Sequence, residues 1–301
     1  MNAQKYYANQ SILVTGGAGF IGSHISQQLV KLGAKVTILD DLSTGNIDNI
    51  EHIKGAVDFI CGSVTDFTVC QKAVKDCEIV FHLAACVSVV QSIKDPHHCF
   101  DTNVTGTLNV LEACKRAGAR RLILSSSSAV YGITDDVCSE SSSCNPVSPY
   151  GVSKLVAERA CSSYAHIFQT VSLRYFNVYG ERQNPLGEYA AVVSRFRHLI
   201  SQNKPITIYG DGLQTRDFVH VGQVVEANLK AGMLKERYAR GNVYNIAQGQ
   251  SISLLDLLEQ LKQEYKTYSQ PINFMSARDG DIRHSRADYS LWQNIESQVD
   301  L

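Results

Sequence analysis

Apolar residues in the first half of this chain occur in short continuous runs, separated by stretches with a helical period. The runs lie at residues 11–15, 35–39, 57–60, 79–85 and 121–124. Uninterrupted apolar runs of this length are typical of parallel strands buried on both faces. Because helical stretches separate them, the pattern predicts an α/β fold built on a doubly wound parallel sheet.

The same pattern predicts helices at residues 67–75, 103–116 and 253–264, and further strands at residues 171–174 and 243–246. A chain of 301 residues suits one large domain, or a main domain with a smaller one joined to it. We therefore expect the sheet to carry a smaller C-terminal domain.

Three glycines follow the first strand directly. The spacing of Gly16, Gly19 and Gly22 allows a tight turn, a close approach of the backbone to a pyrophosphate and tight packing of the next helix. The second strand leads to Asp40, 18 residues after Gly22, where a carboxylate binds the ribose hydroxyls of a dinucleotide. Since a carboxylate repels a 2′-phosphate, the motif favours NAD over NADP. A purely structural strand, turn and helix with an exposed aspartate is the alternative.

Two polar residues near strand ends allow two interpretations each. Asp66 follows the third strand, where it would present its carboxylate to an adenine amino group, and it equally fits the N-cap of helix 67–75. His82 invites a catalytic role, but a histidine inside a buried strand is more often a hydrogen-bonded core residue. We expect a structural role for His82, and both roles are compatible for Asp66.

A serine run and a tyrosine–lysine pair supply candidate chemistry. The fifth strand leads into Ser125 to Ser128, at the carboxyl edge of the sheet where ligands bind. Tyr150 and Lys154, four residues apart, project from one face of a helix that Pro149 begins. A neighbouring ammonium favours the phenolate form of tyrosine, so the pair predicts a general base. Because this spacing also arises by chance, the glycine loop is needed to support it.

The composition limits the kinds of partner that the protein is expected to bind. The net charge is −1, with no lysine-rich run, so no nucleic-acid partner is expected. The first ten residues are polar and no apolar run reaches membrane-spanning length, so a soluble, cytoplasmic protein without a membrane partner is expected. The nine cysteines include no Cys-x-x-Cys pair, which agrees with a reducing compartment and predicts no metal site.

Taken in order, these motifs resemble the extended short-chain dehydrogenase/reductase family, and most closely its nucleotide-sugar 4-epimerases of the UDP-galactose or UDP-N-acetylglucosamine type. The matching segments extend over nearly the whole chain: residues 15–24, 82–85, 103–107, 150–154, 174–180, 210–212, 216–221 and 278–281. Members of the family usually carry about two dozen more residues after the segment that matches residues 285–288.

The resemblance implies a division of the chain. A Rossmann NAD-binding domain would occupy residues 1–176, with residues 218–250 as further scaffold. A smaller substrate-binding domain would form from residues 177–217 and 251–301. It also implies a homodimer, in which helices near residues 103–116 and 150–168 pair into a four-helix bundle.

The resemblance implies site residues as well. For NAD it implies Gly16, Gly19, Phe20, Ile21, Gly22, Asp40, Asp41, Ser43, Thr44, Gly45, Val64, Asp66, Leu83, Ala84, Ala85, Thr102, Tyr150, Lys154 and Tyr175. For the sugar nucleotide it implies Ser126, Ser128, Asn177, Tyr209, Arg216, Arg278, Asp281 and Ser285. Arg216 and Arg278 would clamp the diphosphate, for which a guanidinium fork is suited, and Tyr209 would stack on uracil. A solvated surface position is the alternative for each arginine.

The implied reaction begins with Tyr150 as a phenolate, which takes the proton of the sugar 4-hydroxyl while hydride passes from C4 to NAD. Lys154 would lower the pKa of Tyr150, and Ser127 would bind the 4-oxygen and relay the proton. Dehydratases and decarboxylases of the family place acidic residues near the catalytic hydroxyl, whereas Ser128 and Ala129 follow it here. Epimerisation is therefore favoured over elimination.

Ser285 decides the expected substrate. It occupies the position where glucose-only epimerases carry a tyrosine, and a serine leaves room for an acetamido group. We expect interconversion of UDP-N-acetylglucosamine and UDP-N-acetylgalactosamine, and of UDP-glucose and UDP-galactose. A UDP-glucuronate 4-epimerase, or another NAD-dependent enzyme that modifies nucleotide sugars, is the alternative. A non-catalytic NAD-binding scaffold is a third possibility, although such relatives commonly lose the tyrosine or the lysine.

Overall fold

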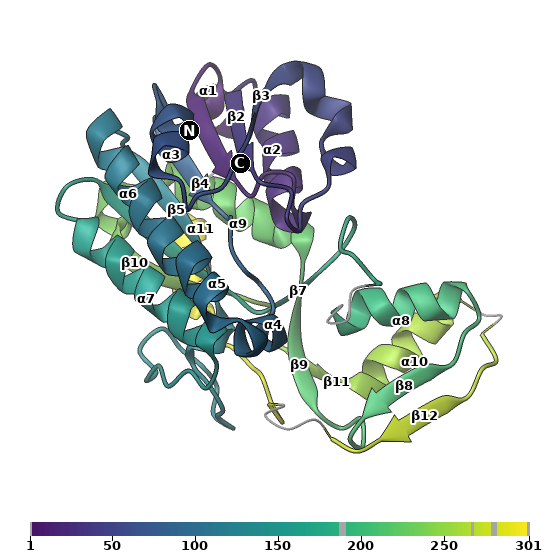
Figure 1. Ribbon diagram of the computed structural model, residues 1–301. Coiled ribbons are helices and arrows are strands. Elements are labelled where there is room, and N and C mark those ends of the chain that lie inside the picture. Colours follow the sequence, from purple (N-terminus) through teal and green to yellow (C-terminus); the bar gives the residue numbers. More distant parts are fainter. Residues whose placement is uncertain (1, 187–190, 266–267, 278–281, 300–301) are drawn as a thin grey trace.

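A seven-stranded parallel sheet organises the larger part of the molecule (Figure 1), whose computed structural model describes all residues except 1, 187–190, 266–267, 278–281 and 300–301. The strand order is β10-β6-β5-β4-β1-β2-β3. The strands are β1 Ser11–Thr15, β2 Lys35–Asp40, β3 Val57–Cys61, β4 Ile79–His82, β5 Arg121–Ser127, β6 Gln169–Tyr175 and β10 Arg240–Ile246. The order changes direction between β1 and β4, which leaves a crevice at their carboxyl ends. The predicted fold class is confirmed.

Strand β1 lies at the centre of the sheet, where Leu13 pairs in register with Thr37 of β2 and Val80 of β4. Every residue of β4 is buried. The continuous apolar runs therefore correspond to strands covered on both faces, as their composition predicts.

Helices cover both faces of this sheet. One face carries α1 Ala3–Tyr7, α2 Phe20–Lys31, α9 Val221–Met233 and α11 Ser290–Glu296. The other carries α3 Phe67–Val74, α6 Gly106–Ala117 and α7 Pro149–Tyr164. The short helices α4 Val89–Lys94 and α5 Pro96–Phe100 contact α7. Although the sequence groups residues 251–301 with the substrate-binding part, Trp292 and Ile295 of α11 pack into the core under the large sheet.

The smaller part projects from the sheet on two strands, β7 and β9 (Figure 1). Its strands are β7 Asn177–Tyr179, β8 Ile206–Tyr209, β9 Thr215–His220, β11 Ser251–Ser253 and β12 Ile272–Met275. Its helices are α8 Val192–Ser201 and α10 Leu254–Glu264. Phe196, Ile208 and Leu258 belong to its separate hydrophobic core. This separate core supports the predicted division into a large and a small part, whose exact boundaries remain a prediction.

Two predicted elements differ from the structure at their ends. The helix expected at residues 103–116 begins as a π-helix, Asp101–Thr105, before α6 continues it. The strand expected at residues 79–85 ends at His82. Beyond it, the amide of Leu83 donates to the carbonyl of Thr15 at 3.1 Å and to its hydroxyl at 3.2 Å, and the amide of Ala84 donates to the same hydroxyl at 3.2 Å. Both irregularities lie beside the crevice, and π-helical turns are frequent at functional sites.

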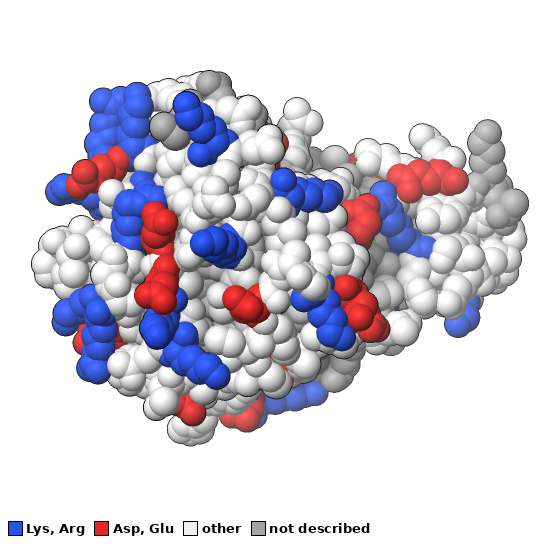
Figure 2. Space-filling view, turned by 90° about the horizontal axis from the view of Figure 1, so that it is seen from above, with Lys and Arg blue, Asp and Glu red and all other residues white. Residues whose placement is uncertain are grey.

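The face of the molecule seen from above carries basic and acidic side chains interspersed with one another (Figure 2). Mixed charges of this kind produce only weak long-range fields. Among the described helices, none combines the length and apolar character that crossing a membrane requires.

Candidate active site

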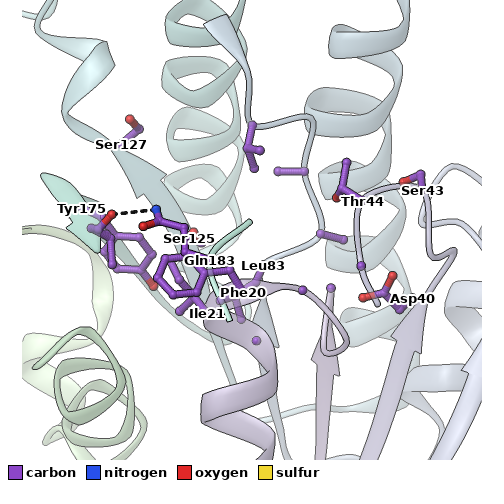
Figure 3. A pocket seen from close by; sticks show the side chains of 18 of the residues that line it. Phe20, Ile21, Asp40, Ser43, Thr44, Leu83, Ser125, Ser127, Tyr175 and Gln183 are labelled. Carbon is purple, nitrogen blue, oxygen red and sulfur yellow. Dashed lines mark hydrogen bonds between the residues drawn. The ribbon is translucent and has the colours of Figure 1, made fainter. Parts of the chain in front are cut away.

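A cavity of about 1110 Å³ opens at the carboxyl ends of the central strands. It is larger than the roughly 300–1,000 Å³ of a site for one drug-sized ligand. Figure 3 shows Asp40 at one end of the cavity and Ser127 and Tyr175 at the other. The predicted site residues that line it are Gly16, Gly19, Phe20, Ile21, Gly22, Asp40, Asp41, Ser43, Thr44, Gly45, Val64, Leu83, Ala84, Ala85, Thr102, Ser126, Ser127, Ser128, Tyr150, Lys154, Tyr175 and Asn177. The fold thus brings most of the predicted residues to one place.

The glycine loop is closely packed against the strand ends. Gly16 has φ 67°, and a Cβ there would lie 2.7 Å from the amide nitrogen of Ala84. A Cβ on Gly22 would lie 2.1 Å from the carbonyl oxygen of Gly16, so helix α2 approaches the turn as only glycine permits. No side chain caps the N-terminus of α2. Its first amides and its dipole are therefore suited to a pyrophosphate.

Asp40 holds the glycine loop and the loop after β2 together, at the end of the cavity away from Tyr175 (Figure 3). Its carboxylate accepts hydrogen bonds from the amides of Ala18 and Leu42, both at 2.9 Å. Burial raises the pKa of Asp40, and these two hydrogen bonds act in the opposite direction. A carboxylate fixed in this way retains lone pairs for ribose hydroxyls. The uncapped helix and the placed carboxylate together fit the two ends of an ADP unit, such as that of NAD.

Asp66 caps helix α3, accepting hydrogen bonds from the amides of Thr68 at 2.8 Å and Val69 at 3.2 Å. Of the two roles predicted for Asp66, the role as N-cap of this helix is confirmed. Its contact with adenine remains a prediction.

His82 is buried inside β4 and bridges two threonines. Its Nε2 lies 3.0 Å from Thr107 Oγ1, and its Nδ1 lies 2.7 Å from Thr15 Oγ1. Because the Thr107 hydroxyl already donates to the carbonyl of Asn103, Nε2 must carry the proton and Nδ1 must accept one from Thr15. Burial lowers the pKa of His82 to about 3, so the ring is neutral. The structural role expected for His82 is confirmed: it fixes Thr15, which in turn holds the loop after β4.

Asn103, in the π-helix, connects that loop to the helix of the tyrosine–lysine pair. Its side chain accepts from the amide of Cys86 at 2.8 Å and donates to Ser153 Oγ at 2.9 Å. Ser153 in turn donates to the carbonyl of Tyr150 at 2.8 Å. The first turn of α7 is thereby tied to the cavity wall.

The tyrosine–lysine pair lies in the cavity beside the serine run. Tyr150 and Ser127 both line the cavity, and the side chain of Ser127 is near enough to lower the pKa of Tyr150. Lys154 is 4% exposed, its Nζ donates to the carbonyl of Ser125 at 2.8 Å, and it lies 5.9 Å from the centroid of the Tyr150 ring. Tyr150, Ser127 and Lys154 therefore form one cluster, as the spacing of the motif predicts.

The titration of this cluster differs from the expectation that Lys154 lowers the pKa of Tyr150. Burial raises the pKa of Tyr150 to about 12, and the nearby side chain of Ser127 opposes this only in part. Burial also lowers the pKa of Lys154 to about 8. Each group loses the hydration of its charged form on burial, and this loss is the largest cause of both shifts.

A buried ion pair behind the serine run was not predicted. Arg174 binds Glu158 through two nitrogens, at 2.7 and 2.9 Å, and Glu158 accepts from the hydroxyl of Ser126 at 2.5 Å. The hydroxyl hydrogen of Ser126 is therefore directed to Glu158, although the residue lines the cavity as predicted. Glu158 lies four residues after Lys154 on α7, so helical spacing alone places it on the same face.

The predicted substrate residues lie mostly in the smaller part. Asn177 lines the cavity and donates to the carbonyl of Asp217 at 2.9 Å. Arg216 of β9 donates to the carbonyl of Thr215 at 2.9 Å, and the amide of Ser285 binds the same carbonyl at 3.1 Å. Tyr209 ends β8. Arg278 and Asp281 lie outside the described residues.

Comparison with known proteins identifies the family. The model of the NAD dependent epimerase/dehydratase family matches residues 12–247. The chain belongs to this family. This member of the family is 40% identical over 297 residues to a protein named putative UDP-glucose 4-epimerase from Methanocaldococcus jannaschii, covering 96% of this chain and 94% of the relative.

Two solved structures are similar to this family member over nearly its whole length. One is UDP-N-acetylglucosamine 4-epimerase from Methanobrevibacter ruminantium in complex with UDP-N-acetylmuramic acid, with a TM-score of 0.91, 36% identity, and coverage of 96% of this chain and 92% of that one. The other is UDP-glucose 4-epimerase from Thermus thermophilus in complex with NAD, with a TM-score of 0.86, 34% identity, and coverage of 97% and 95%. NAD as the cofactor and the resemblance to this family are confirmed.

Proposed function

We propose that this protein is an NAD-dependent 4-epimerase of UDP-hexoses, acting by transient oxidation at C4 and return of hydride to the opposite face of the sugar. The observation that carries the proposal is that Tyr150, Ser127 and Lys154 line the same cavity as the glycine loop. Ser127 lies at the end of this cavity away from Asp40 (Figure 3), which supports a proton acceptor and a hydroxyl relay there. The sugar names carried by the relatives support the substrate class.

In this proposal Tyr150 takes the proton of the sugar 4-hydroxyl, and Ser127 hydrogen-bonds the 4-oxygen. Bound NAD supplies the hydride acceptor for C4 and afterwards the hydride donor. The ammonium of Lys154, beside the ring, stabilises the phenolate as it forms. The 4-keto sugar turns over between the two transfers, so Tyr150 returns the same proton and net redox is zero.

The residues near the catalytic hydroxyl favour epimerisation over elimination. Ser128 and Ala129 follow Ser127 in the chain, and neither is a carboxylic acid. Among the residues described as lining the cavity, the acidic ones are Asp40 and Asp41, at the adenosine end. Loss of a sugar hydroxyl would need an acid at the other end.

For the substrate, we propose UDP-N-acetylglucosamine and UDP-N-acetylgalactosamine, together with UDP-glucose and UDP-galactose. The amide of Ser285 donates to the carbonyl of Thr215 at 3.1 Å, and its carbonyl accepts from the hydroxyl of Ser251 at 2.7 Å. These two bonds support a fixed position of Ser285 beside Arg216. A small side chain there would admit an acetamido group. In the same proposal Arg216 and Arg278 bind the diphosphate, with Tyr209, Asn177 and Asp281 completing the nucleotide and phosphate contacts.

The test is to incubate the protein and NAD with each UDP-sugar, UDP-glucuronate included, and to separate the C4 epimers. Epimers of the acetylated and non-acetylated hexoses are expected. Turnover of UDP-glucuronate alone would favour the alternative substrate, and formation of a 4-keto-6-deoxy sugar would refute the proposed reaction. Bound NAD with no turnover of any UDP-sugar would indicate the non-catalytic scaffold.

Ser285 variants test the substrate gate. Ser285→Tyr should abolish turnover of the acetylated pair and retain that of the non-acetylated pair, because the ring fills the acetamido space. Ser285→Ala is the matched control and should keep both. Equal loss of both substrate classes in Ser285→Tyr would contradict the gate.

We also propose a cytoplasmic homodimer. Leu108 of α6 and Val156 of α7 are 41% and 39% exposed, on two helices that pack against each other. Apolar side chains on adjacent helices support the expected pairing into a four-helix bundle.

A further inference from the structure

The segment that follows β7, residues 180–185, reaches from the smaller part back to the helix of the glycine loop. Arg182 donates to Ser23 Oγ at 3.2 Å and to Gln27 Oε1, both on α2, and lies 3.4 Å from His52 Nε2. The ring of His24, also on α2, lies 3.0 Å from the carbonyl oxygen of Glu181. These contacts join residues more than 100 positions apart in the chain, so they tie the two parts of the molecule together.

The same segment forms a wall of the cofactor cavity. Arg182 and Gln183 line the cavity together with Phe20 and Ile21 of α2. Figure 3 shows Gln183 beside Tyr175, at the end of the cavity away from Asp40. Gln183 is itself held, because it donates to the carbonyl of Val178 at 3.0 Å. The segment therefore forms part of the wall of the site that would hold the dinucleotide.

The backbone of Arg182 is in a conformation that arginine rarely adopts. Its φ is 64°, in the left-handed region that favours glycine and asparagine. Such a residue persists only where its surroundings hold it, and it is often found at clamps for ligands. The side-chain contacts to α2 are the interactions that hold Arg182.

Burial lowers the pKa of Arg182, and an acidic neighbour, Glu181, raises it. The guanidinium contacts on Ser23, Gln27 and His52 are with uncharged acceptors, and no ion pair between it and a carboxylate occurs among the described residues. A guanidinium that lines the same cavity as the uncapped N-terminus of α2 is suited to a diphosphate.

We propose that Arg182 is a positioning residue that latches residues 180–185 onto α2 across the cofactor cleft and so keeps NAD bound throughout the catalytic cycle. A latch is needed because epimerisation is redox-neutral only if the reduced cofactor stays until it returns the hydride. The inference depends on NAD as the cofactor, and it does not depend on which sugar nucleotide is the substrate.

The test compares Arg182→Asn with Arg197→Asn. Asparagine accepts the left-handed backbone at position 182, so the substitution removes the guanidinium without adding strain. Arg197 lies on α8 and pairs with the exposed Glu264, away from the cavity. The measurements are the NAD content after gel filtration, and the rate at which NADH fluorescence is lost when NADH-loaded protein is diluted into excess NAD.

Arg182→Asn should release NADH about tenfold faster or more, whereas Arg197→Asn should match the unmodified protein. During turnover, Arg182→Asn should also release NADH into solution, and added NAD should restore part of its activity. A release rate within about twofold of the unmodified protein would overturn the proposal. Because no sugar is needed for the release measurement, failure of the latch and failure of the proposed reaction can be distinguished.

Gln27→Ala provides a second variant, since it removes an acceptor from α2 and leaves Arg182 in place. It should also accelerate release, by a smaller factor, with the thermal unfolding temperature of the NAD-free protein unchanged. An unchanged release rate in Gln27→Ala would show that the tie to α2 does not retain NAD, and the latch would be refuted.

Discussion

At the residue scale, burial opposes the chemistry that Tyr150 has to perform. The burial that raises its pKa to about 12 disfavours the phenolate as long as no substrate is bound. Ser127 lines the same cavity, so in the proposed reaction a sugar 4-hydroxyl would lie between two hydroxyl groups. The environment of Tyr150 therefore favours a base that works on a bound substrate.

Removing either hydroxyl should slow the reaction without releasing the cofactor. Tyr150→Phe and Ser127→Ala should each lower kcat by about 10²–10⁴-fold, the usual contribution of a positioned acid or base. Tyr238→Phe, at a partly buried tyrosine outside the cavity, is the control. Initial rates and NAD content would both be measured, and a kcat within about threefold of normal for Tyr150→Phe would exclude it as the base.

His82 should make the protein sensitive to mild acid. Its pKa is about 3 in the folded protein against 6.5 as the ordinary value, so the unfolded chain takes up the proton first as pH falls. This contribution to stability is complete above about pH 6.5 and is lost towards pH 3, at about 1.4 kcal/mol per pH unit.

The check for His82 is the free energy of unfolding by urea between pH 7 and pH 5. His82→Asn should show a slope with pH that is smaller by about one proton, even if its stability at pH 7 is reduced. His166→Asn, at an exposed histidine, should keep the original slope. Equal slopes in all three proteins would mean that His82 does not titrate as described.

At the scale of elements, a buried arginine of the sheet binds the C-terminal end of helix α9. Arg121 of β5 is 2% exposed, and its guanidinium donates to three carbonyls at the end of α9: Ala231 at 2.9 Å, Gly232 at 2.5 Å and Leu234 at 2.5 Å. Orphan carbonyls at a helix end need partners when they are buried. Arg121 therefore fastens α9 to the sheet.

Replacing Arg121 with methionine should cost about 3 kcal/mol or more, because buried carbonyls are left without donors. The measurement is the free energy of unfolding of the NAD-free protein. Arg240→Met, which removes an exposed pair with Glu236, should cost less than about 1 kcal/mol. A similar small loss for Arg121→Met would show that water reaches the end of α9.

The sequence predicts those parts of the fold that depend on residues close together in the chain. The strand at residues 11–15 has the observed bounds because its apolar run and the glycine after it both mark its ends. Gly16, Asp40, Tyr150 and Lys154 follow from spacing along single elements. Arg182 does not, because its role depends on a left-handed backbone and on partners 130 or more residues away. The pKa of Tyr150 was mispredicted because desolvation depends on tertiary packing.

At the scale of the whole molecule, the proposed dimer should depend on the faces of α6 and α7. Glutamates at Leu108 and Val156 together should convert the protein to monomers, since charges are costly in the core of an interface. Leu291→Glu, on α11 at the opposite face of the sheet, is the control. Light scattering after gel filtration gives the mass directly, and an unchanged dimer in the double variant would place the interface elsewhere.

The π-helix at Asp101–Thr105 has a consequence for how the chain tolerates length changes. Each residue added to or removed from a helix turns everything beyond it by about 100°. Deleting one residue between positions 101 and 105 would leave a more regular helix, yet it would rotate Asn103 away from either Cys86 or Ser153. The additional residue of this π-helical turn thus sets the rotation at which Asn103 reaches both Cys86 and Ser153, and a regular α-helix would not keep both contacts.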